Sequence, residues 1–369
     1  MKHLLLLVAL GPLAVAQAPA AVQGRWTSDA HDYWTRNSTE RWVSIQLERG
    51  DERSGLGVPE RAVPALADER GSGAVHFTVR RDAGTFQFDG QLSNGRGSGA
   101  FTFAPDAAYI SGMAQLGYRL GDDDVWRFAI HDITREYVQG LQREGVRNAA
   151  ASDLVKMRIH GVDPAYVASY RTAGYQLGVD DLVKTRIHGA TPAFAQEVKK
   201  EGLGTPDVDD LVKMRIHGVT PEFIRQMRDL GYKDLSIDQL VGFRIHGVTP
   251  EFVKAFADLG YKNLTSDNLV AMRIHGVTPE FVKSLSGLGY ANVPVEDLIK
   301  MRIHGVTPEY IKQMKDVGYG NVKVDRLVEF RIHGVDADFV RAAKAHGFNN
   351  LSAEDLVDLS IHGRRWMKG

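Results

Sequence analysis

The sequence contains no cysteine. Disulfides, thiolate metal sites and cysteine nucleophiles are therefore excluded, and the folded state must be held together by packing. After the first residues no apolar run is long enough to span a bilayer. The net charge is −1 over 369 residues, so the chain also lacks the basic field that holds nucleic acid or an anionic membrane. We therefore expect no nucleic-acid partner and no transmembrane segment in the mature protein.

One apolar segment stands at the N-terminus. Residues 1–3 read Met-Lys-His, and residues 4–16 are apolar except for one glycine and one proline. This segment is too short to anchor a protein in a bilayer comfortably, and Ala14-Val15-Ala16 fits the small-residue rule for signal cleavage. The pattern predicts a signal peptide over residues 1–16, cut before Gln17. We expect an exported protein, periplasmic or extracellular.

A histidine recurs in matching contexts along most of the chain. The spacing is 29 residues, with one step of 28 that we place in a loop between Gly174 and Leu182. A glycine follows fourteen residues after each of the first eight histidines, and seven of the nine copies read Arg-Ile-His-Gly. The histidines are His131, His160, His188, His217, His246, His275, His304, His333 and His362. Self-similarity at a fixed period of this length is typical of repeat proteins.

Each repeat begins with signals for a first short helix. In Thr249-Pro250-Glu251, Thr is a cap, Pro fits the first turn, and Glu suits the positive end of the helix dipole. Apolar residues at 252, 253, 256 and 259 then share one helical face. Gly260 is expected in the left-handed position that ends a helix, with Tyr261 folding back as its apolar partner.

A second helix is expected to start near Thr265 or Ser266 and to end at His275 and Gly276. Residues 269, 270, 272 and 274 are apolar, so we expect this helix to be buried on most sides. One such pair cannot bury its apolar face alone, whereas stacked pairs share a continuous core. About nine pairs fit between Pro105 and His362, and we predict an α-solenoid of helical hairpins over residues 105–363. Residues 364–369 form a basic tail that we expect to cover the last face.

Residues 17–104 follow a different pattern. Apolar and polar side chains alternate over 43–47, 77–79, 86–88 and 101–103, which is typical of strands with one buried face. Asp82-Ala83-Gly84 and Ser93-Asn94-Gly95 suit hairpin turns. We therefore predict an α+β chain whose small antiparallel sheet rests on the first helix pair. Residues 49–73 are expected to form a long, partly mobile excursion.

The recurring histidines could bind metal, because histidine is the commonest metal ligand. Packed helices lie about 8–10 Å apart, however, and zinc needs several ligands near 2 Å, which one histidine per repeat does not supply. We expect each histidine to end its helix, and we expect no metal and no cofactor. A role in pH-tuned packing or in ligand contact is left as an alternative. The candidate residues, called the histidine ladder, are His160, His188, His217, His246, His275, His304 and His333.

Two residues before each of these histidines stands an arginine. Arginine near a helix C-terminus is favoured by the dipole, and we expect pairs with first-helix acids such as Glu222, Glu251, Glu280 and Glu309. The functional alternative is a stripe of planar donors that grips a long anionic or carboxylate-bearing partner. This arginine ladder comprises Arg158, Arg186, Arg215, Arg244, Arg273, Arg302 and Arg331.

The repeat, written Leu-Val-x-x-Arg-Ile-His-Gly-Val-Thr-Pro-Glu-Phe with Leu-Gly-Tyr, resembles the periplasmic extensions of some bacterial membrane metallopeptidases of the beta-lactam-sensor type. The stretch from residues 82–86 through 99–103 is similar to the segment that precedes the repeats there. The resemblance covers most of the mature chain and implies location and architecture rather than activity. The sequence contains no multi-span membrane portion and no His-Glu-x-x-His motif, so no peptidase residue is carried over.

Catalytic motifs are not found in the sequence, which shows no Gly-x-Ser-x-Gly elbow and no phosphate loop. We therefore expect a binding or scaffold protein, not an enzyme, that presents its repeat surface to a protein or peptide partner. An envelope sensory or regulatory module, with the histidines responding to pH, is the alternative. A glycan-active enzyme is a remote alternative, since the carboxylates in the excursion form no convincing acid–base pair. Those carboxylates are Asp51, Glu52, Glu60, Asp68 and Glu69.

Overall fold

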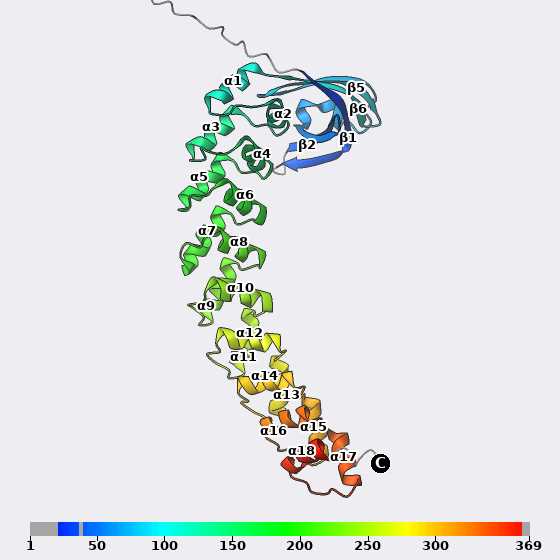
Figure 1. The fold of residues 1–369 in the computed structure, drawn as a ribbon, viewed down its shortest axis with the longest axis vertical. Coiled ribbons are helices and arrows are strands. Elements are labelled where there is room, and N and C mark those ends of the chain that lie inside the picture. Colours follow the sequence, from blue (N-terminus) through cyan, green and yellow to red (C-terminus); the bar gives the residue numbers. More distant parts are fainter. Residues whose placement is uncertain (1–20, 37–39, 364–369) are drawn as a thin grey trace, which may run out of the picture. The chain divides into compact units, whose positions relative to one another are not determined.

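The structure, a computed structural model, describes residues 21–36 and 40–363. The predicted signal peptide, residues 1–16, and the basic tail, residues 364–369, lie outside the described residues. In the part of the chain described, six strands precede 18 α-helices that recur in pairs (Figure 1). The predicted fold class, a small antiparallel sheet followed by an array of 29-residue helical hairpins, is confirmed.

The chain separates into two compact units by its internal contacts. The first unit ends at Ile187 and contains the sheet and the helices that follow it. The second unit begins at His188 and contains helical repeats alone.

Six antiparallel strands make one sheet in the order β3-β2-β1-β6-β5-β4. The strands are β1 (Val22–Arg36), β2 (Glu40–Arg49), β3 (Glu52–Pro59), β4 (Gly73–Arg81), β5 (Gly84–Ser93) and β6 (Arg96–Pro105). The expected turns are both present. Residues 82 and 83 join β4 to β5, and Asn94-Gly95 joins β5 to β6. Asn94 and Gly95 have φ of 50° and 76°, the backbone of a tight hairpin turn that Asn-Gly favours.

The expected excursion over residues 49–73 is wrong. Most of this stretch is ordered as β3 and two short 3₁₀ turns, η1 (Glu60–Ala62) and η2 (Pro64–Ala67). Leu56 and Val58 are fully buried, and Leu66 of η2 is buried as well. Gly55 and Gly57 flank Leu56 in the sequence, so only Leu56 and Val58 alternate as apolar residues, which is too short a pattern to indicate a strand. Strand β1, with buried Trp26, was missed as well, because the residues on both sides of Trp26 are mostly polar and show no apolar alternation.

The apolar face of the sheet rests on the first helix pair, as expected. Trp126 of α2 (Asp122–Ile130) stacks on Phe101 with ring centroids 5.7 Å apart and meets Phe86 and Phe103 edge-on at 5.6 Å each. The Arg49 guanidinium covers Trp126 at 5.3 Å and pairs with Asp123 at 2.8 Å. Helix α2 therefore has five buried residues, because the sheet covers a side of it that other second helices leave open.

The helices alternate between a first and a second helix of each hairpin. The first helices are α1 (Ala107–Gln115), α3 (Arg135–Arg143), α5 (Pro164–Thr172), α7 (Pro192–Val198), α9 (Pro221–Asp229), α11 (Pro250–Asp258), α13 (Pro279–Gly287), α15 (Pro308–Asp316) and α17 (Ala337–Ala345). The second helices are α2 (Asp122–Ile130), α4 (Ala151–Ile159), α6 (Val179–His188), α8 (Val208–Ile216), α10 (Ile237–His246), α12 (Ser266–Ile274), α14 (Val295–Ile303), α16 (Val324–Ile332) and α18 (Ala353–His362). A single π-helical turn, η3 (Lys199–Leu203), extends α7.

The helix ends follow the sequence signals. The Thr249 hydroxyl accepts a hydrogen bond from the Phe252 amide at 3.2 Å, with Pro250 in the first turn. At the other end Gly260 takes φ of 94°, and the Tyr261 amide donates to the Phe256 carbonyl at 3.0 Å. This is the glycine-terminated end that the sequence predicts. The deleted residue of the 28-residue step falls in the loop before α6, as expected.

Within each unit, helices of the same kind pack on each other in successive hairpins. First helices contact the next first helix, as α3 does with α5 and α11 with α13, and second helices contact the next second helix, as α10 does with α12. Tyrosine hydroxyls tie neighbouring repeats together by donating to loop carbonyls 32 residues onward. These bonds run from Tyr232 to Leu264, Tyr261 to Val293, Tyr290 to Val322 and Tyr319 to Leu351, at 2.7–2.9 Å. The tyrosine of Leu-Gly-Tyr is thus part of the stacking.

Removing the aromatic contact between sheet and helices should be costly. We expect Trp126→Ala to lower the free energy of unfolding by about 3–5 kcal/mol, because it leaves a large cavity against three phenylalanines. Denaturant unfolding followed by circular dichroism measures the change. Ile159→Ala is the control, since Ile159 is 56% exposed, and it should cost less than about 1 kcal/mol. Equal losses in the two variants would contradict this account of the junction.

Candidate interaction surface

The arginine ladder lies over aromatic rings of the first helices. Each guanidinium sits 4.0–5.1 Å from the ring centroid of the Phe or Tyr in its own hairpin. The pairs are Arg158–Tyr137, Arg186–Tyr166, Arg215–Phe194, Arg244–Phe223, Arg273–Phe252, Arg302–Phe281 and Arg331–Tyr310. Cations at this distance are attracted to the negative ring face, so each arginine links the two helices of a hairpin.

The same arginines reach the preceding repeat. Arg273 Nε donates to the His246 carbonyl, and Arg302 Nε donates to the His275 carbonyl, both at 3.4 Å. Among the described residues none of the expected ion pairs to Glu222, Glu251, Glu280 or Glu309 joins an arginine of the ladder, so that expectation is wrong. The guanidinium lies over a ring and a helix end instead, where it satisfies a terminal carbonyl that the helix leaves open.

The motif glycine makes room for this arrangement. Gly276 has φ of 68°, which a side chain rarely adopts, and a Cβ there would stand 3.0 Å from the Arg302 guanidinium. Gly247 is tighter, at 2.7 Å from that of Arg273. Arg-Ile-His-Gly therefore combines a helix end with a close inter-repeat contact.

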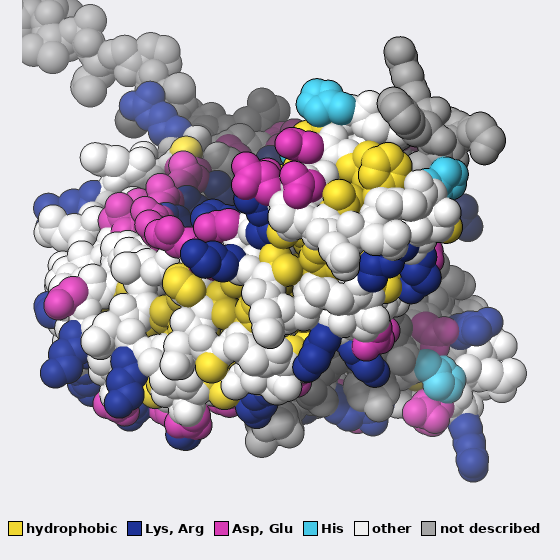
Figure 2. Space-filling model, turned by 90° about the horizontal axis from the view of Figure 1, so that it is seen from below, with side chains coloured by type: hydrophobic (Ala, Val, Ile, Leu, Met, Phe, Trp, Pro, Cys, Tyr) yellow, Lys and Arg dark blue, Asp and Glu magenta, His cyan; other side chains and the backbone are white. Residues whose placement is uncertain are grey.

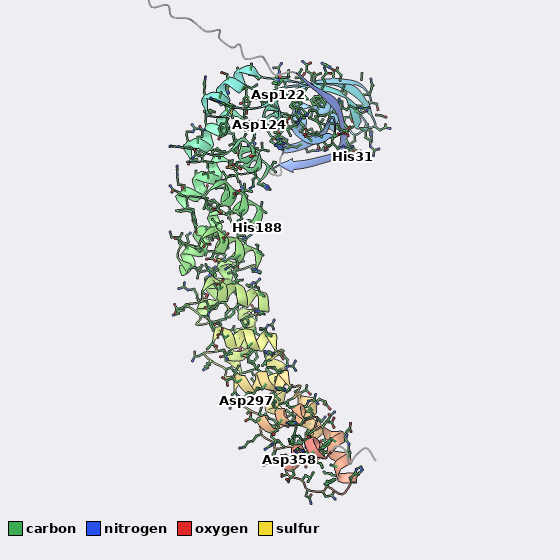
Figure 3. The ribbon with its side chains drawn as sticks, in the orientation of Figure 1. His31, Asp122, Asp124, His188, Asp297 and Asp358 are labelled. Carbon is green, nitrogen blue, oxygen red and sulfur yellow. The ribbon has the colours of Figure 1, made fainter. Side chains whose placement is uncertain are left out.

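The histidine ladder ends the second helices, as expected. His188 and His246 are the last helical residues, and the other ladder histidines follow directly as the capping residue. Figure 3 labels His188 at the end of α6. Most of these side chains are exposed, and those of His275 and His333 are half-buried. Among the described residues no three His, Asp or Glu side chains come together as metal ligands.

The isoleucine directly before the motif histidine is exposed in every repeat from α4 onward. Its exposed fraction is 47–58% at Ile159, Ile187, Ile216, Ile245, Ile274, Ile303, Ile332 and Ile361, here called the isoleucine ladder. The expectation of a second helix buried on most sides is therefore wrong. In α12 the buried residues are Leu269 and Met272, and Ile274 lies about 200° around the helix from Met272 at 3.6 residues per turn. Figure 2 shows apolar side chains at the surface among the charged ones.

Lysines bridge some neighbouring second helices. Lys156 Nζ lies 2.6 Å from Asp180 in the first unit, and Lys213 Nζ lies 2.7 Å from Asp238 in the second. The hydrogen bond from Lys156 lowers the pKa of Asp180, whose charged form it favours. Each bridge joins the lysine four residues before one histidine to an acid in the first turn of the next second helix.

The acids at the start of α2 have a structural role. Asp124 accepts a hydrogen bond from the Gly121 amide at 3.2 Å, and Asp123 pairs with Arg49. Figure 3 shows Asp122 and Asp124 at this helix start beside the sheet.

In the residues that are described, no helix is long and apolar enough to cross a membrane.

No protein-family model matches the chain, and no curated protein matches it in sequence. The resemblance to the metallopeptidase extensions therefore stays a prediction.

We expect the arginine contacts to stabilise the array. Arg273→Met should lower the free energy of unfolding by about 1 kcal/mol, and a double-mutant cycle with Phe252→Leu should give a coupling of about 0.5–1 kcal/mol. The control is Arg225→Met, whose arginine makes a surface pair with Glu222 and should change stability by less than about 0.5 kcal/mol. A coupling of zero would show that the ring contact contributes nothing.

His131, in the first repeat, should make stability depend on pH. Burial lowers the pKa of His131 below its ordinary value of 6.5, and the nearby Arg127 acts in the same direction. The unfolded state then binds the proton more readily, so this stabilisation is complete above pH 6.5 and is lost as the pH falls through the lowered pKa. Unfolding measured from pH 7.5 to 5 should lose this component in His131→Gln. The exposed-ladder variant His160→Gln should keep it, and identical curves for both variants would refute the assignment.

Proposed function

We propose that this chain is an exported binding or scaffold protein whose second-helix ends form a repeated contact surface for an extended protein or peptide partner. The observation that carries the proposal is the isoleucine ladder, because a large apolar side chain is left about half exposed at the same position in eight successive repeats. Exposed apolar groups that recur in register mark interaction sites more often than scattered single ones do.

The neighbours of the isoleucine suit a polypeptide partner. Seven of the eight isoleucines are flanked by an arginine held over a ring and by a histidine at the helix end, and Ser360 stands in the arginine's place beside Ile361. An apolar contact with donors on both sides can take a side chain and the backbone carbonyls around it. Export is supported by the apolar segment of residues 4–16.

Repeat spacing favours an extended partner. Packed helices lie about 8–10 Å apart, and an extended chain in the polyproline II conformation rises about 3.1 Å per residue with three residues per turn. Every third residue of such a partner lies on the same side and can therefore meet a successive isoleucine within a unit. Each contact would contribute about 1 kcal/mol, roughly half the value for burying a whole aliphatic side chain.

A ladder variant tests the proposal. We expect Ile216→Ser, Ile245→Ser and Ile274→Ser together to weaken capture of a partner from an envelope extract about 100-fold, which corresponds to about 3 kcal/mol. Quantitative mass spectrometry of captured proteins is the measurement. Because these side chains already face solvent, the melting temperature should move by less than about 2 °C.

The matched control changes three exposed lysines on first helices, Lys254→Ser, Lys283→Ser and Lys312→Ser. It should capture the partner as the unaltered protein does. Equal capture by the ladder and control variants, or no protein retained above background by the unaltered chain, would show that the isoleucine ladder is not the contact surface.

A further inference from the structure

The lysine that bridges second helices is present in some repeats and absent from others. The bridging position holds Lys in α4, α6, α8 and α14, whereas α10 has Gly242, α12 has Ala271 and α16 has Glu329. The acid that would receive the first missing lysine is still present. Asp267 follows Gly242 by 25 residues, the same separation as between Lys213 and Asp238, which do pair.

Asp267 is an exposed carboxylate at the start of α12. Among the described residues no lysine, arginine or histidine forms an ion pair with it. Its equivalents Asp180 and Asp238 each hold an ammonium group at 2.6–2.7 Å. The position is therefore a bridge that lacks only its cation.

A groove of about 400 Å³ occupies the space between α10 and α12 where the lysine is missing. It is lined by Gly242, Phe243, His246, Val270, Ala271, Ile274 and His275, with Asp238, Gln239, Ser266 and Asp267 at the helix starts. Asp267, Val270, Ala271 and Ile274 follow at i, i+3, i+4 and i+7, so one face of α12 carries an acid and then an apolar strip. The volume lies within the range of ligand pockets in proteins.

The chemistry of the groove selects among occupants. A chelated metal is disfavoured, because its acids stand at one end of the nine-residue α12 and its histidines at the other, about 12 Å apart at 1.5 Å per residue. An anion would be repelled by the negative charge of Asp267, and a purely apolar side chain would leave that charge without a partner. A long aliphatic stem that ends in an ammonium matches both features.

We propose that this groove binds a lysine side chain of a separate protein or peptide partner. The stem lies along Ala271 and Ile274 above the space left by Gly242, and the ammonium donates to Asp267, as Lys213 does to Asp238. Lysine commonly lays its stem on apolar surface while its charge reaches a polar group. The inference rests on the proposed function and names one residue that the partner carries.

The test uses the mature full-length chain and the peptide acetyl-Gly-Lys-Gly-amide, observed by saturation-transfer difference NMR. We expect transfer to the lysine stem protons, with at least about a fivefold loss in Gly242→Lys, whose own side chain fills the groove, and in Asp267→Asn. No atom lies within 4 Å of a Cβ added at Gly242, so this variant should fold. Gly287→Lys, on first helix α13 with equally open space, adds the same charge elsewhere and should bind as the unaltered protein does.

Acetyl-Gly-norleucine-Gly-amide, which has a similar stem and no charge, should give at least about fivefold less transfer. Equal transfer from the two peptides, or equal signals in the Gly242→Lys and Gly287→Lys variants, would overturn the proposal. So would concentration-dependent dimers, seen by sedimentation and abolished by Gly242→Lys, since a second copy would then be the occupant. If the lysine peptide fails while the isoleucine variant still loses its partner, the groove assignment falls and the proposed function stands. If the lysine peptide binds while the isoleucine variant keeps its partner, the isoleucine ladder is not the contact surface, and the groove is a lysine site without the partner role that the proposed function gives it.

Discussion

A hairpin of two short helices has too little inward-facing apolar surface to be stable alone, and this constraint governs the whole array. Isolated helices shorter than about 12 residues are marginal in water, and most helices here have nine or ten residues. Side chains such as Leu269, Met272 and Phe256 reach full burial only because neighbouring hairpins cover them. Buried positions accordingly keep an apolar side chain in most repeats, as Met214, Phe243 and Met272 do at the equivalent position of successive second helices.

Polar contacts then fix how successive hairpins meet. The Arg273 guanidinium touches Phe252 of its own hairpin and the His246 carbonyl of the one before, and the Tyr261 hydroxyl reaches the Val293 carbonyl of the one after. Apolar packing alone tolerates sliding, whereas directional bonds at each end of a repeat accept one register. These arginine and tyrosine contacts account for much of the motif that recurs within the chain, Arg-Ile-His-Gly and Leu-Gly-Tyr. The isoleucine is the member of the motif that stacking leaves unexplained, which is why it carries the functional proposal.

The helical part could be predicted from the sequence because the signals that start and end each helix are local. Thr249-Pro250 and Gly260 determine where a helix begins and ends through their own backbone geometry, so the sequence predicted nine hairpins and the loop deletion correctly. Strand β3 was not readable, because its place beside β2 depends on pairing with residues distant along the chain and on only two buried side chains. The same limit applied to Ile274. A run of apolar residues in a nine-residue helix indicates burial, yet only the packing of neighbouring helices decides which of them face solvent. The aromatic partner of the arginine ladder was missed for that reason too, although each Phe or Tyr stands 20 or 21 residues before its arginine.

Departures from a repeat carry different information from the repeat itself. Residues common to all copies meet a structural requirement that every hairpin shares, and here that requirement is stacking. Gly242 and Ala271 meet no such requirement: glycine weakens a helix interior, and each change removes a lysine that neighbouring repeats use to reach an acid. Glu329 stands at the same position of α16, so stacking does not require a lysine there. Gly242 and Ala271 lie on adjacent second helices and together line one groove next to the carboxylate of Asp267. A ligand that brings its own cation would fill this groove and pair with Asp267 at once.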